Sequence, residues 1–309
     1  LSSVIDISSK STMSKTVKSQ FGFNGINADA LLEVPIVEDK LNIIGSFRRS
    51  YDDALKTFTF NQLTDKVFEG TKINQSDDGN NMFSFLDYSV KLNFKPNKNN
   101  SLYASIISID NQLDYTLDDT ENNRRLNDKL VTSNIGYGLG WRMKWNEKIT
   151  QNTNAFFSDY KLNYNFITVE GDTQVSDFEK RNTIFDSGFS SEVTIDRSKA
   201  TQITFGYQYA LKDVAFAFLN TTNLSFVLDT EDNTIQTHSV YGQYNYKNPK
   251  LFNLSFGLRT TYFNELDAVR LEPRIVVYKP LLKNLKFQAT AEIKNQIISE
   301  IDETILSDL

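Results

Sequence analysis

The sequence contains no cysteine, only one histidine (His238) and no run of eighteen apolar residues. The absence of cysteine excludes disulfides, thiolate metal sites and cysteine nucleophiles. A single histidine argues against a zinc or haem site, so we expect neither a metal nor a cofactor. The absence of a long apolar run excludes a transmembrane helix. It does not exclude a membrane protein, because strands that cross a bilayer turn only about half of their residues toward lipid.

Hydrophobic residues make up only 39% of the chain, whereas aromatic residues reach 13%, with 23 Phe and 14 Tyr. Few aliphatic residues beside many aromatic ones are typical of a transmembrane barrel, with its polar lumen and its aromatic girdles. The net charge of -6 argues against nucleic-acid binding, which usually needs a basic face. No secretory signal precedes Leu1, so we expect the sequence to start at a processed or internal point.

Alternation of period two is the dominant pattern. From Val131 to Trp145 the odd positions are largely apolar, and the even positions between them are small, polar or charged. The same pattern recurs in residues 202–211, 252–259 and 285–294. These segments run for roughly ten to fifteen residues, which exceeds the usual five or six of soluble strands and matches a tilted membrane crossing.

We predict thirteen strands, the first two joined by a tight turn at residues 25–27, where the apolar face changes parity. The predicted strands are residues 17–24, 28–36, 41–51, 83–94, 102–113, 131–145, 149–162, 183–196, 200–212, 235–247, 251–263, 270–279 and 285–297. Long polar loops are expected at one end only, at residues 52–81, 114–130, 161–182 and 212–234, and short turns at the other.

An odd number of strands does not close a standard bacterial barrel. We therefore expect an open, curved antiparallel sheet that is incomplete at both ends, with free edges at residues 17–24 and 285–297 and Leu309 in an outer loop. Parity assigns the two faces. Lipid-facing residues should include Tyr137, Leu139, Phe205, Phe256 and Phe287, and lumen-facing residues Arg142, Gln208, Arg259 and Gln288.

Seven charged residues fall on the predicted lumen face: Arg48, Arg142, Lys144, Arg259, Glu272, Arg274 and Glu292. They are candidates for solute binding. The plainer interpretation is that they are solvated lumen charges, since the interior of any such barrel is polar. Trp141 and Trp145 could form a sugar platform, but their place beside a turn favours an interfacial girdle.

Other polar clusters favour structural interpretations. The acidic stretch of residues 114–128 lacks the glycine and terminal glutamate of a calcium loop, and residues 229–233 are similar to it in this respect. We interpret both as solvated outer loops and His238 as an ordinary strand residue. No carboxylate pair lies beside a histidine, serine or lysine arrangement, so we expect no catalytic residue and no enzyme.

Three segments carry a family resemblance: LSSVIDISSK at residues 1–10, FGFNGINADALLEVPIVEDKLNIIGSFRRSY at residues 21–51 and RLEPRI at residues 270–275. They resemble the end of the plug, the first barrel strands and a recurrent strand start of TonB-dependent outer-membrane receptors. The resemblance implies that residues 1–16 end a plug domain and residues 17–309 begin a barrel of 22 strands, about nine of which would follow Leu309.

The resemblance also implies a function: energy-coupled uptake of a scarce solute across the bacterial outer membrane. TonB would pull on the plug, and lipid and lipopolysaccharide would surround the barrel. A surface lipoprotein partner stays open, because the opening differs from that of paired starch-uptake receptors. The alternatives are a scaffold in a larger outer-membrane complex, a passive porin-like channel and, least in keeping with the long strands, a soluble β-sandwich.

Overall fold

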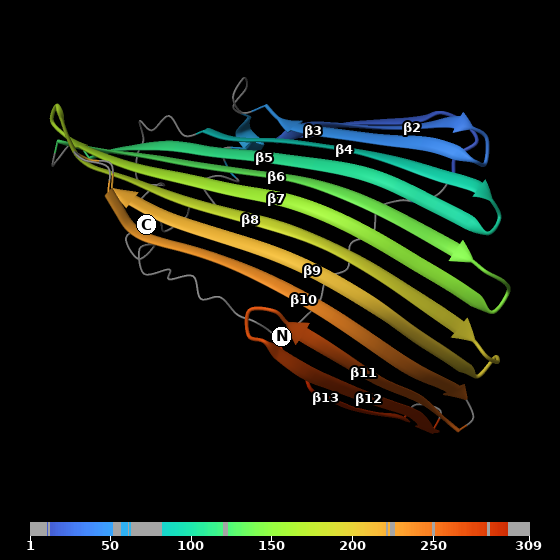
Figure 1. The fold of residues 1–309 in the computed structure, drawn as a ribbon. Coiled ribbons are helices and arrows are strands. Elements are labelled where there is room, and N and C mark those ends of the chain that lie inside the picture. The colour runs from blue at the N-terminus through green and yellow to red at the C-terminus, as the bar shows by residue number, and fades with distance from the viewer. Residues whose placement is uncertain are drawn as a thin grey trace.

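The computed structural model describes residues 11, 13–51, 57–60, 62, 82–119, 123–220, 222, 226–248, 251–282 and 285–295. Within these residues the chain forms thirteen strands (Figure 1). Their bounds are β1 Lys18–Phe23, β2 Asn27–Val37, β3 Leu41–Ser50, β4 Met82–Asn97, β5 Asn100–Asp119, β6 Arg124–Lys144, β7 Ile149–Glu170, β8 Thr173–Asp196, β9 Thr201–Asn220, β10 Phe226–Asn248, β11 Phe252–Phe263, β12 Ala268–Leu282 and β13 Leu285–Glu292.

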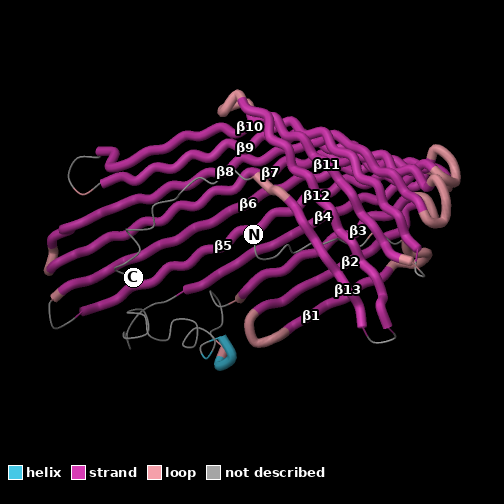
Figure 2. Tube along the Cα trace, turned by 90° about the horizontal axis from the view of Figure 1, so that it is seen from below, coloured by secondary structure: helices cyan, strands magenta, loops and turns pink. Residues whose placement is uncertain are grey.

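The strands form a single antiparallel sheet in chain order, so each strand pairs with its sequence neighbours. The sheet is long, twisted and curved (Figures 1 and 2). Among the strands that the structure describes, β1 and β13 lie at the two ends of this order and do not pair with each other. The predicted open sheet of thirteen antiparallel strands is confirmed. No described helix has the length and apolarity of a membrane-spanning helix.

The strand registers confirm the predicted faces. Tyr137 of β6 pairs with Phe157 of β7, Phe157 pairs with Ser187 of β8, and Ser187 pairs with Leu211 of β9. Since directly paired residues share a face, the apolar side chains of successive strands fall on one side. We call this side, which carries Phe256, the lipid face. The opposite side, which carries Arg259, is the lumen face.

The lipid face holds most of the large apolar side chains of the molecule. Leu139 is 58% exposed and Phe256 51% exposed, whereas only four large apolar side chains of the described residues are buried. Each Å² of apolar surface left in water costs roughly 25 cal/mol. This face therefore requires an apolar environment outside the chain. Trp141 and Trp145 lie beside the turn between β6 and β7, at what we call the inner end of the sheet, and donate hydrogen bonds to Asn100 and Gln151 at 3.0 Å.

Three of the predicted outer loops are strands instead. Residues 114–130, 161–182 and 212–234 largely continue the pairing of β5 to β10, so these strands reach 20 to 24 residues. Gly171, at a φ of 59°, closes one hairpin with a tight turn. The antiparallel order places the three hairpin ends at the same end of the sheet, as predicted. Residues 52–81 lie mostly outside the described residues.

We call the part of the sheet beyond the paired row Ile109, Asn134, Tyr160, Ile184, Val214 and Asn233 the outer extension. Here the polarity of the two faces is inverted. The continuation of the lipid face carries Asp110, Lys161 and Arg181. The continuation of the lumen face carries Leu130, Tyr164 and similar residues. An outward face that has left the lipid meets water, which accounts for its charges.

Candidate functional site on the lumen face

Four of the seven candidate residues meet on β11, β12 and β13. Arg259 and Glu272 are direct cross-strand partners with an Nε–Oε2 distance of 3.4 Å. Arg274 and Glu292 form the same kind of pair at 3.5 Å. Lys294 adds a third cation 3.0 Å from Glu292. Opposite charges that face each other across strands stabilise the pairing, and together they form a charged ladder along this part of the wall.

The ladder continues onto β10 and β8 through Arg259. Its guanidinium donates to Ser239 Oγ at 2.8 Å and lies 5.9 Å from the ring centre of Tyr241. Tyr241 in turn donates to Glu192 Oε2 at 3.0 Å. Glu192 and Tyr241 were not among the predicted site residues, although both lie at lumen positions of alternating strands. The alternation along β8 and β10 would have placed both residues on the lumen face.

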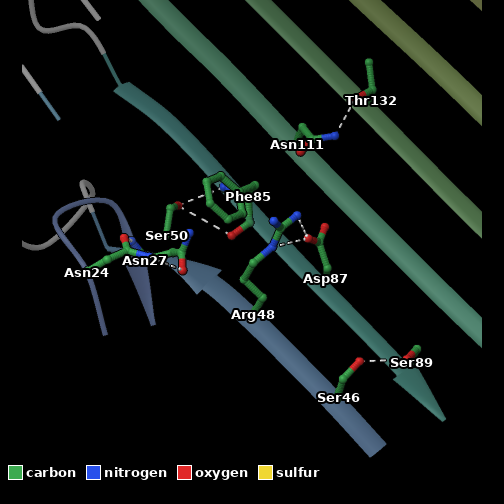
Figure 3. A network of polar contacts seen from close by, with 10 residues as sticks. All are labelled: Asn24, Asn27, Ser46, Arg48, Ser50, Phe85, Asp87, Ser89, Asn111 and Thr132. Atoms are coloured by element: carbon green, nitrogen blue, oxygen red, sulfur yellow. Dashed lines mark hydrogen bonds and ion pairs between the residues drawn. The ribbon is translucent and has the colours of Figure 1, made fainter. Parts of the chain in front are cut away.

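Arg48 forms a separate ion pair on β3. Its Nε donates to Asp87 of β4 at 2.7 Å, and its guanidinium lies 5.0 Å from the ring centre of Phe85 (Figure 3). The same two strands are joined by Ser46 and Ser89, whose hydroxyls lie 2.7 Å apart. Polar side chains thus bridge neighbouring strands of the lumen wall in this region too.

Arg142 and Lys144 lie on the lumen face at the inner end of β6, as predicted. Within the part of the chain that the structure describes, neither forms an ion pair. They are therefore the two candidates whose charge the wall leaves unneutralised. The structure does not bring them together with the ladder on β11 to β13, because four strands separate β6 from β11.

Glycine lies directly opposite an aromatic residue at three places on this face: Gly140 and Tyr103, Gly188 and Phe156, and Gly206 and Tyr241. A Cβ atom built on any of these glycines would collide with the opposing ring. The rings therefore lie flat across the glycine backbone. This arrangement explains Gly140 of β6, Gly188 of β8 and Gly206 of β9 by contacts within the sheet.

The segment before β1 contacts the lumen face. Ser11 accepts a hydrogen bond at 3.0 Å from Lys91 Nζ of β4. Further along, Lys15 lies 3.5 Å from Asp39 in the turn after β2. Residues 1–10, which carry the plug resemblance, lie outside the described residues. The contact at Ser11 shows that the chain reaches β1 from the lumen side.

The remaining sequence candidates have structural partners. His238 lies on the lipid face, where its Nδ1 is 2.8 Å from the hydroxyl of Tyr207 and its ring is 5.1 Å from that of Tyr209. The acidic residues 114–128 belong to the β5–β6 hairpin, in which Arg125 pairs with Asp118. No described group of three or more histidine, cysteine or carboxylate residues is arranged to hold a metal ion.

No family model matches the sequence, and no curated protein matches it. Solved structures do. The siderophore receptor PirA from Pseudomonas aeruginosa superposes with a TM-score of 0.53 at 12% identity, over 90% of this chain and 40% of that one. The outer membrane transporter YddB from Escherichia coli gives 0.56 at 10% identity, over 84% and 36%. The fold is that of an outer-membrane β-barrel.

The ferric enterobactin receptor PfeA from Pseudomonas aeruginosa shares this barrel fold, with a TM-score of 0.54 at 11% identity over 90% of this chain. The chain spans about two fifths of the length of PirA and of PfeA. Within the barrel wall, the lumen face offers paired charges, hydroxyls and flat aromatic rings. These groups can hold and pass a solute by hydrogen bonds and ionic contacts.

Proposed function

We propose that the protein takes up a scarce solute across the bacterial outer membrane in a step coupled to TonB. The observation that carries this proposal is the contact between Ser11 and Lys91. It supports the proposal because Ser11, which directly follows the segment that resembles the end of a plug, contacts the lumen face of the sheet. On this reading residues 1–16 end the plug and residues 17–309 form barrel wall, surrounded by lipid and lipopolysaccharide.

In this mechanism the wall binds and passes the solute without changing its covalent structure. Arg142 and Lys144, which form no ion pair with any described residue, are the cations that a solute would meet at the inner end of β6. The ladder around Arg259 is already neutralised by Glu272, so it contributes a polar surface with little net charge. TonB acts on the plug, whose movement opens the path along this surface.

The proposal is tested by labelling the plug contact in living cells. Because residues 1–309 contain no cysteine, Ser11→Cys introduces a single thiol into this segment, and any cysteine elsewhere in the full-length protein is replaced by serine. We expect a maleimide that enters the lumen to label Ser11→Cys faster in energised cells that contain TonB than in cells that lack it. Asp172→Cys is the control, since Asp172 is exposed at the tip of the β7–β8 hairpin outside the lumen, and its labelling should not depend on TonB.

Labelling at Ser11→Cys that is identical with and without TonB would overturn the energy-coupled function. A passive channel would then show the same solute uptake in energised and de-energised cells. A scaffold would show no uptake and would instead purify from the membrane in fixed stoichiometry with other proteins.

A further inference from the structure

The lumen side of the outer extension is an apolar wall. Its strands carry apolar side chains at most inward positions, although both faces of a solvated hairpin would ordinarily be polar. We call this surface the outer wall; its apolar members are Ile109, Leu113, Tyr115, Leu126, Leu130, Tyr160, Leu162, Tyr164, Phe166, Phe178, Ile184, Val214, Phe216 and Phe218. Apolar residues that gather on a face outside a packed core are a feature of ligand-binding surfaces.

Aromatic rings form the part of the outer wall on β8 and β9. Phe178 and Phe218 stack with ring centres 5.6 Å apart and an interplanar angle of 16°. The ammonium of Lys180 lies 5.5 Å from the ring centre of Phe216. Tyr164 lies opposite Lys180 on the neighbouring strand. These rings provide flat faces on which a ring of a solute can stack.

A buried carboxylate lies among these apolar residues. Asp128 is only 2% exposed. Its Oδ2 accepts hydrogen bonds from the hydroxyls of Tyr115 and Tyr164, the latter at 3.1 Å. Its Oδ1 has no hydrogen-bond partner. Burial raises the pKa of Asp128, and the two tyrosine hydrogen bonds counter that shift in part.

Two further acceptors on the outer wall also have no partner. Thr168 Oγ1 is fully buried on β7, and Asn182 Oδ1 is buried on β8. Thr168 lies diagonally across from Asp128 on the neighbouring strand, whereas Asn182 lies four positions along β8 from Phe178, which is in the row of Asp128. Buried polar groups are nearly always hydrogen-bonded, so Asp128 Oδ1 and Thr168 Oγ1 point to a group that is bound at times. The Asp128 carboxylate oxygen accepts a hydrogen bond and the Thr168 hydroxyl can accept one, so a hydrogen-bond donor fits both atoms.

We propose that the outer wall binds a solute that has an aromatic ring face and hydrogen-bond donors and that is neutral or cationic. This inference rests on the proposed function, since it names the substrate class of the same path. The stacked rings select the flat face, Asp128 Oδ1 and Thr168 Oγ1 select a donor, and the Asp128 carboxylate disfavours an anionic group. The aromatic residues of β9 in this region, Phe216 and Phe218, lie on the lumen side, whereas Ala215 and Ala217 lie on the outward side.

Three small probes that share one ring and differ in charge test the proposal: tyramine, tyrosol and 4-hydroxyphenylacetate. Their affinities for the full-length protein in detergent are measured by saturation-transfer NMR and calorimetry. We expect tyramine to bind about tenfold more tightly than 4-hydroxyphenylacetate, the size of one charge-assisted hydrogen bond. Tyrosol should fall between them. Asp128→Asn should remove the difference between the cationic and the anionic probe.

The aromatic requirement is tested with Phe216→Ala and Phe218→Ala, which should weaken binding of all three probes. Ala215→Ser and Ala217→Ser lie on the same strand but on the outward face, and these controls should bind normally. Migration of unheated samples on gels verifies that each variant is folded. Equal affinity for the three probes, or normal binding by folded Phe216→Ala and Phe218→Ala, would overturn the proposal.

The failure of this inference is distinct from the failure of the proposed function. The probes bind purified protein without TonB or an energised membrane. Normal probe selectivity together with TonB-independent labelling of Ser11→Cys would leave the binding site in place and remove energy coupling. TonB-dependent labelling of Ser11→Cys without probe selectivity would leave energy coupling in place and remove the binding site. The apolar outer wall would then be a surface that another segment of the protein covers.

Discussion

At the residue scale, the lumen wall depends on contacts between directly opposed side chains on adjacent strands. Gly140 and Tyr103 illustrate this. The aromatic ring occupies the space that a Cβ atom on Gly140 would fill. The ring therefore stays flat against the wall, where Lys91 lies 4.8 Å from its centre. A larger residue at position 140 would turn Tyr103 into the lumen.

We predict that Gly140→Ala destabilises the barrel by about 1–3 kcal/mol, the usual cost of forcing an extra methyl group into a filled space. Denaturant unfolding in detergent measures the change. Gly45→Ala is the matched control, because nothing lies within 4 Å of a Cβ atom at that position. Equal unfolding midpoints for the two variants would contradict the account, whereas Tyr103→Ala should rescue Gly140→Ala.

Tyr115 and Tyr164 make a second residue-scale prediction, on pH. Burial, together with the neighbouring Asp128 carboxylate, raises the pKa of both phenols above the ordinary value of 10.0. The folded state therefore favours their protonated forms. Their contribution to stability is present below pH 10 and is lost as the pH rises further toward the folded-state pKa.

Asp128→Asn should lower the pKa of both phenols, because it removes the negative charge that opposes their ionisation. Absorbance at the tyrosinate band during alkaline titration measures this, with Tyr115→Phe and Tyr164→Phe identifying each phenol. A titration curve that Asp128→Asn leaves unchanged would show that the carboxylate does not govern these groups.

At the element scale, the sequence predicted the number, order and facing of the strands but not their length. Alternation as regular as that of Phe205, Tyr207 and Tyr209 permits one sheet register, since a shift of one residue would reverse both faces. The outer extension was missed because the polarity of its faces inverts. Along β7, Phe157 faces lipid, but Asp159 and Lys161 on the same face meet water. Strand ends that are predicted from apolar residues on the outward face therefore fall short of the observed strand ends.

The candidate site shows the same division. Parity predicted Arg48, Arg259 and Glu292, because the alternation within a single strand is enough to place a charged residue on the lumen face. Parity alone did not find that Arg259 pairs with Glu272 or that Tyr241 reaches Glu192. Those contacts depend on the register between strands, which the turns set and which a single strand does not contain.

The hairpins of the outer extension predict where a protease can cut. We expect proteinase K, added to intact cells, to cleave at the tip of the β7–β8 hairpin around Gly171 and Asp172, where the side chains are exposed. Residues 146–148 connect β6 and β7 at the opposite end of the sheet and should be spared. Cleavage at residues 146–148 with an intact β7–β8 hairpin would invert the orientation. Mass spectrometry of the fragments distinguishes the two results.

At the scale of the whole molecule, the sheet has little interior of its own. Large buried apolar side chains number four among the described residues, whereas Phe21, Leu139 and many similar residues are exposed on the lipid face. Apolar surface of this extent is stable only against lipid, and unpaired strand edges are costly in lipid. The account therefore requires that lipid cover one face of the sheet and water the other. In the outer extension, the outward face must meet water instead of lipid.

A cysteine scan along β9 tests this central claim directly, because residues 1–309 contain no cysteine and any cysteine elsewhere in the protein is replaced by serine. Full-length protein in outer-membrane vesicles is labelled with a water-soluble maleimide at single positions from 204 to 217. The account predicts labelling at Thr204, Gln208 and Ala210, protection at Phe205 and Tyr207, and labelling again on the outward side at Asp213 and Ala215. Strong labelling of Phe205→Cys with protection of Gln208→Cys would contradict it.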